Sequence, residues 1–201
     1  MYKKQMAFQK IVCMLTLVAA ALIFVYSLGI STDLYDALSK TIAYPEYGSE
    51  YLDQTAVTGS RVYYDMFKFN SAFTKVSIGL IIVTLILFIT NTHARRKYYI
   101  GNYIAVGLST VANISMTLWC IPQIMGYKAQ YQNNVNFEEL KEFSELWRTI
   151  YIGPEDTFWF DVSYAFFGFL LLATCLLVLN VVWKIMMMKA EESAIGSRKG
   201  E

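Results

Sequence analysis

The stretch that decides the fold runs from Val162 to Trp183 and reads VSYAFFGFLLLATCLLVLNVVW. It contains no acidic or basic residue, and a run of about 20 residues matches a hydrocarbon layer of roughly 30 Å at about 1.5 Å per residue. Because lipid offers the backbone no hydrogen-bond partner, such a run crosses a membrane as a helix. The sequence therefore predicts an all-α membrane protein.

Three further runs have the same character, and together they predict a four-transmembrane-helix bundle. The expected spans are residues 11–30, 72–92, 99–126 and 160–184. Two structured outer segments, residues 31–70 and 128–158, join the first span to the second and the third to the fourth. Residues 1–190 are then a single membrane domain. Residues 191–201 are expected to be a flexible tail, because they hold few apolar groups.

Charged residues are segregated between the two sides of these spans, although the formal net charge is only +1. Most acidic residues fall in the two outer segments, and basic residues gather at the other ends: Lys3, Lys4, Lys10, Arg95, Arg96, Lys97, Lys184 and Lys189. The positive-inside rule places both termini in the cytoplasm. Arg95, Arg96 and Lys97 are expected to contact lipid headgroups or a cytoplasmic partner.

The cysteines and sequons indicate the compartment. Cys13, Cys120 and Cys175 all lie in expected spans, so the outer segments contain no disulfide framework. The outer segments also contain no N-glycosylation sequon. Both absences are typical of the plasma membrane of a bacterium, which is the expected location.

The second outer segment contains an amphipathic helix. Asn136 stands at an N-cap position, and apolar side chains follow it three or four residues apart: Phe137, Leu140, Phe143 and Trp147. Gly153 and Pro154 then prevent the helix from continuing. The apolar face either packs on the protein's own bundle or docks a partner.

The third span carries a polar face. Asn102, Ser109, Asn113 and Thr117 recur close to the helical period. Small and polar groups let helices approach closely and hydrogen-bond to one another in a membrane. The face therefore indicates helix packing, and its alternative role is to line a polar pathway.

One ion pair is expected at the outer ends of two spans. Lys75 lies near the amino end of its helix, where the helix dipole disfavours a cation, whereas Asp161 suits the same position in the fourth span. Asp161 is therefore the expected partner of Lys75. The alternative is that the Lys75 side chain extends to the outer headgroups.

Several classes of site are not indicated by the sequence. His93 is the only histidine, and no group of cysteine and histidine residues has the spacing of a metal site. No phosphate-binding loop or nucleophilic triad is present. We therefore expect no catalytic residue, no cofactor, no metal and no nucleic-acid partner. The expected partners are membrane lipids and another integral membrane protein.

Three strings carry a resemblance to known sequences. They are RVYYDM at 61–66, FITNTHARRKYYIGNY at 88–103 and FWFDV at 158–162. They resemble uncharacterised four-span proteins of Gram-positive bacteria that accompany carbohydrate ABC importers. The resemblance implies a transporter permease as partner and supplies no site residues.

The leading hypothesis is therefore a non-enzymatic accessory or scaffold subunit of a larger membrane complex, a sugar ABC transporter in the first place. One alternative is a small oligomeric transporter or channel that uses the polar face of the third span. Another is a membrane enzyme that acts at the outer interface through acids such as Asp65 and Asp161.

Overall fold

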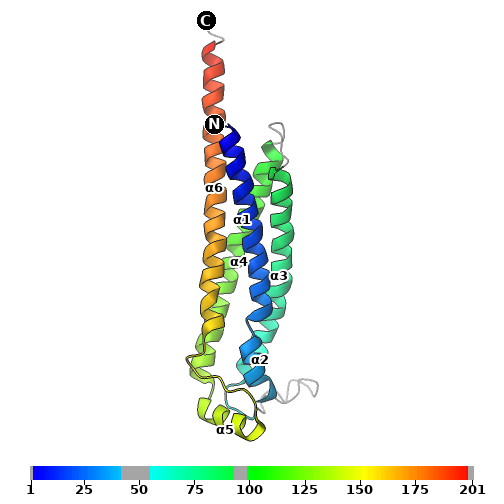
Figure 1. The fold of residues 1–201 in the computed structure, drawn as a ribbon, viewed down its shortest axis with the longest axis vertical. Helices are drawn as coiled ribbons and strands as arrows, with labels where there is room; N and C mark the ends of the chain where they lie inside the picture. Colours follow the sequence, from blue (N-terminus) through cyan, green and yellow to red (C-terminus); the bar gives the residue numbers. More distant parts are fainter. Residues whose placement is uncertain (1, 42–54, 93–98, 199–201) are drawn as a thin grey trace. The chain divides into compact units, whose positions relative to one another are not determined.

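The computed structural model describes residues 2–41, 55–92 and 99–198, in which all the elements are helices (Figure 1). The long helices are α1 (Tyr2–Gly29), α3 (Arg61–Thr92), α4 (Tyr99–Asn134) and α6 (Phe158–Arg198). The short ones are α2 (Thr32–Leu38), the 3-10 helix η1 (Ser39–Thr41) and α5 (Phe137–Trp147). Each long helix is long and apolar enough to cross a membrane. The predicted all-α fold with four spans is confirmed.

Each long helix extends beyond the span expected for it. At the outer end, α3 begins at Arg61 instead of residue 72, and α4 ends at Asn134 instead of residue 126. The 36 residues of α4 correspond to about 54 Å of helix. The hydrocarbon layer is only about 30 Å thick. α4 is therefore about 24 Å longer than the hydrocarbon layer is thick.

In α4 and α1, the exposed apolar side chains mark the part of the helix that faces lipid. In α4 they run from Ile104 to Trp119, a height of about 22 Å. In α1 they run from Ile11 to Leu28, a height of about 26 Å. Bands of this height suit the hydrocarbon layer, so lipid can cover them.

The helices contribute to two compact units, and the first consists of Met1–Leu22, Ile78–Thr117 and Gly168–Glu201. Segments of α1, α3, α4 and α6 meet in its apolar core, which contains Val12, Cys13, Leu87, Ala105, Val106 and Leu177. Four helical segments thus share one core, as the predicted bundle requires.

The second unit consists of Ile23–Ser77 and Leu118–Phe167. Its core is aromatic: the ring of Phe73, which is fully buried, lies 6.0 Å from that of Tyr26 and 6.2 Å from that of Phe167. The Tyr26 hydroxyl donates a hydrogen bond to the Trp159 carbonyl at 2.7 Å. Buried aromatic rings thus join α1, α3 and α6 in this unit.

The ends of two helices test local predictions. The Asn136 side chain accepts hydrogen bonds from the Glu138 and Glu139 amides, so the expected N-cap of α5 is present. At the carboxyl end, α6 continues to Arg198, so residues 191–198 are helical where a flexible tail was expected. Glu191, Glu192, Ala194 and Arg198 in this stretch all favour a helix.

Candidate functional site

The polar face of α4 is buried within the first unit. Asn102, Ser109, Asn113 and Thr117 are 4%, 0%, 0% and 8% exposed. Asn113 Nδ2 donates to Thr174 Oγ1 of α6 at 2.8 Å, and Thr117 Oγ1 donates to the Asn113 carbonyl at 2.9 Å. The face therefore lies against a neighbouring helix of the same chain.

A cluster of four buried carboxamides, which the sequence did not reveal, joins three helices of the first unit. Gln5 Nε2 donates to Gln9 Oε1 and to Asn180 Oδ1, both at 3.1 Å. Gln9 Nε2 donates to the Asn91 carbonyl at 2.7 Å. These bonds connect α1 to α3 and α6. One signal for this cluster was present in the sequence. Gln5 and Gln9 are four residues apart, and this spacing places two side chains on the same face of a helix.

Lys184 is also part of this unit's interior. Its side chain is only 8% exposed, and Nζ lies 5.6 Å from the centroid of the Tyr103 ring. The Tyr103 hydroxyl in turn approaches Met188 Sδ at 3.6 Å. A ring face stabilises a partly desolvated ammonium group. Lys184 therefore differs from the solvated flanking residue that its position in the sequence indicated.

Asp161 has a different partner from the expected one. Lys128 Nζ donates to Asp161 Oδ1 at 2.6 Å, and Thr157 Oγ1 donates to Oδ2 at 2.7 Å. Lys75 is exposed, and the described residues show no ion pair between it and Asp161. The expected pair is therefore corrected to Lys128–Asp161. The other expected contact group, Arg95 to Lys97, lies outside the described residues.

The four apolar residues predicted for α5 divide into two sets. Leu140 is fully buried, and the Phe137 ring meets the Tyr131 ring edge-on at 5.3 Å. Phe143 is half-buried, and its ring lies 6.2 Å from that of Trp147, which is 65% exposed. The amino-terminal part of the helix thus packs on its own unit, whereas Trp147 at its carboxyl end is mostly exposed.

The exposed end of α5 continues into the residues after it. We define the α5 cluster as Leu146, Trp147, Ile150 and Tyr151, which are 76%, 65%, 57% and 42% exposed. Large apolar side chains that lie together on a surface mark an interaction site more often than scattered ones do. The α5 cluster is therefore the strongest candidate docking surface in the second unit.

A groove between α3 and α4 is a second candidate surface of this unit. It has a volume of about 540 Å³ and is lined by Asp65, Lys68, Phe69, Trp119, Gln123, Tyr127 and Gln130. The Phe69 ring lies 5.5 Å from the Trp119 ring and 5.6 Å from the Tyr127 ring. Aromatic side chains thus form its apolar part, and amides and charges surround them.

The segment before α3 holds the start of α5 in place. The Asn136 amide donates to the Thr58 carbonyl at 3.0 Å, and the Thr58 amide donates to Glu139 Oε2 at 2.8 Å. The hydrogen bonds from Thr58 are the main reason why the pKa of the Glu139 carboxyl lies below its usual value. The orientation of α5 therefore depends on a contact between residues far apart in the sequence.

Known proteins give no further guidance to these surfaces. No protein-family model, curated protein or solved structure matches the chain. What is established is a helical protein with four helices able to span a membrane, and its function has to be argued from the surfaces described above.

Proposed function

We propose that the chain is a non-catalytic accessory subunit of a larger membrane complex. The observation that carries the proposal is the α5 cluster, in which Leu146 and Trp147 are 76% and 65% exposed. Leaving such side chains in water forgoes about 1.5–3 kcal/mol for each one that could be buried. A partner protein that covers them recovers this free energy.

Lipid is a poor candidate for covering the α5 cluster. The Tyr131 hydroxyl donates to the Gly153 carbonyl at 2.7 Å, and Gln132 Nε2 donates to the Pro154 carbonyl at 3.1 Å. These bonds hold the chain after the cluster level with residues 131–132. That level is about 18 Å along α4 from Trp119, the last large apolar side chain of the lipid-facing band.

The surroundings of the α5 cluster resemble the rim of a protein interface. Exposed charged residues lie on the same helix and just after it: Lys141, Glu142, Glu145 and Arg148. Interfaces place large apolar side chains at the centre and polar ones at the rim, and tryptophan is among the side chains that contribute most. A protein partner fits this arrangement.

The partner in this proposal is the permease of a carbohydrate ABC importer. This choice follows from the resemblance noted in the sequence, which implies a transporter complex. The burial of the polar face of α4 supports an accessory role over a channel, because Asn113 is 0% exposed and already bonded to Thr174. A lumen between copies of the chain needs that face to be accessible.

The experiment measures the size of the complex that contains the tagged full-length chain after extraction in a mild detergent. We expect wild type to elute as a large particle with one companion membrane protein in fixed stoichiometry. The double variant Leu146→Ser/Trp147→Ser is expected to elute alone, with affinity lowered roughly 30-fold or more. The matched control is Phe67→Ser/Phe158→Ser, which removes two exposed aromatic side chains of the same unit outside the α5 cluster.

Two results contradict the proposal. One is a wild-type particle that contains only copies of this chain. The other is a double variant that retains its companion as well as the control does. Circular dichroism of each variant checks that the helices remain formed.

A further inference from the structure

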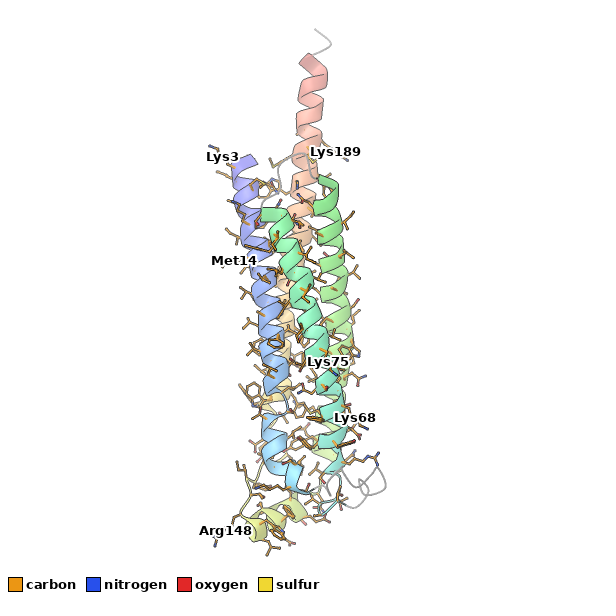
Figure 2. The ribbon with its side chains drawn as sticks, turned by 90° about the vertical axis from the view of Figure 1, so that its right-hand side faces the viewer. Lys3, Met14, Lys68, Lys75, Arg148 and Lys189 are labelled. Atoms are coloured by element: carbon orange, nitrogen blue, oxygen red, sulfur yellow. The ribbon has the colours of Figure 1, made fainter. Side chains whose placement is uncertain are left out.

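Two lysines of α3 lie on one face of the helix. Lys68 and Lys75 are seven residues apart, which is nearly two full turns, and both side chains are exposed. Figure 2 shows them one above the other along α3. Between them, Ser71 and Ala72 are also exposed and are small. The two positive charges are therefore separated by small side chains, which leave room for a ligand between them.

Lys75 lies at the edge of the lipid-facing band. The next residue, Val76, is 47% exposed and begins the continuous run of exposed apolar side chains in α3. Because Asp161 is paired with Lys128 at 2.6 Å, the acid expected to neutralise Lys75 is engaged elsewhere. A lysine at this depth extends its ammonium group to the headgroup level. Side chains of a helix lean toward its amino end, which directs Lys75 over Ser71.

Lys68 lines the groove between α3 and α4. Its Nζ lies 4.5 Å from the centroid of the Tyr64 ring, one turn toward the amino end of α3. Asp65, the acid of the groove, is 3.7 Å from Arg61 Nε, so its charge is largely compensated. The patch formed by these four side chains therefore has a net charge of +2, counted from Arg61, Lys68, Lys75 and Asp65.

The groove lies where the lipid-facing band of α4 ends. Leu118 is 71% exposed, and Trp119, which lines the groove, is 37% exposed. Tryptophan favours the boundary between hydrocarbon and headgroups. Acyl chains along Leu118 and Val76 would bring a headgroup to the mouth of the groove, where Gln123 offers a polar amide.

We infer that α3 and α4 bind the headgroup of an anionic membrane phospholipid, whose negative charge is attracted by Lys68 and Lys75. The continuity of the groove with the exposed apolar side chains identifies a lipid as the source of the phosphate, rather than a free ion. The net positive charge favours an anionic lipid over a zwitterionic one. This site does not depend on the α5 cluster or on the proposed role in a complex.

The test uses native mass spectrometry of the full-length protein released from bilayers of equal parts phosphatidylglycerol and phosphatidylcholine. We expect wild type to retain one phosphatidylglycerol in preference to phosphatidylcholine. Lys68→Gln or Lys75→Gln should lower this preference roughly fivefold, and the double variant about 30-fold. Lys141→Gln is the matched control, because it removes the same charge from an exposed position on α5.

The outcomes separate the lipid from other ligands. Retention that persists in a large excess of inorganic phosphate supports a site for the whole lipid, whereas displacement by phosphate alone overturns it. Equal selectivity of wild type and the double variant also overturns it. Both lysines are exposed, so the variants should fold. The check is that wild type and variants have the same free energy of unfolding in bilayers of phosphatidylcholine alone.

Discussion

Replacement of Gly59 by alanine is expected to loosen the junction between the segment before α3 and the start of α5. Gly59 has a φ of +80°, in the region that side chains rarely adopt. A Cβ there would lie 1.9 Å from the Asn134 carbonyl oxygen and 2.8 Å from the Val135 nitrogen. Both atoms are backbone, so no side-chain rotation relieves the clash. The segment has to move away from α4.

The size of the effect follows from what that movement breaks. The unfavourable φ costs about 1–2 kcal/mol for a residue with a Cβ. Separation also removes the hydrogen bond from the Asn136 amide to the Thr58 carbonyl, which contributes about 1 kcal/mol. The contact of Thr58 with Glu139 is lost as well. We therefore expect a destabilisation of this junction of about 2–3 kcal/mol.

Amide hydrogen exchange measures this directly, because a local opening raises the exchange rate of the amides that it exposes. The amides of Thr58 and Asn136 should exchange roughly 30- to 150-fold faster in the variant. Gly79→Ala is the matched control: no atom lies within 4 Å of its added Cβ, and alanine favours a helix by about 1 kcal/mol. The reasoning is refuted if Gly59→Ala leaves these rates unchanged, or if both variants shift them equally.

Three other perturbations test the contacts described above. Gln9→Leu should lower the free energy of unfolding by about 1–3 kcal/mol in a detergent titration, because it leaves Asn91 without its 2.7 Å donor; an equal loss in Lys10→Leu would contradict this. Lys128→Gln should cost about 0.2–1 kcal/mol in low salt and less in high salt, whereas Lys75→Gln should change stability little, because only Lys128 is paired with Asp161. The folded-state pKa of Glu139 lies below its usual value of 4.5. The stability that its carboxylate gives to the junction is therefore fully present above pH 4.5 and is lost as the pH falls through the folded-state pKa. The protection factor of the Thr58 amide, which corrects for the pH dependence of intrinsic exchange, should therefore fall in acid, and Glu139→Gln should abolish this fall.

The features that sequence reasoning recovered are those set by local chemistry. The run from Val162 to Trp183 lacks charge over enough residues to require a spanning helix. The α5 helix begins directly after Asn136, because the side chain of Asn136 accepts hydrogen bonds from the amides of Glu138 and Glu139. Neither inference needs to know which helices are neighbours.

The features that it missed depend on neighbours. Asp161 bonds to Lys128 because α4 brings that ammonium within 2.6 Å, and nothing in the spacing of either residue indicates this. Gln5 and Gln9 look like solvated residues of a basic head, yet they are 1% exposed because Asn91 and Asn180 supply partners. Buried amides are tolerated only where such partners exist. Because these partners come from neighbouring helices, the buried part of α1 begins before the apolar run that the sequence shows.

The length of α4 limits which partner can reach the α5 cluster. After Trp119 the helix continues to Asn134, which adds about 22 Å beyond the lipid-facing band. Figure 1 shows α5 at the end of this extension, and the bond from Tyr131 to Gly153 holds the following chain there. A partner made only of spans and short loops ends well below this level. The complex that we propose therefore requires a partner whose outer domain projects about 20 Å from the membrane. Crosslinks from position 147 should form in that domain, and crosslinks that form only in membrane spans would exclude this arrangement.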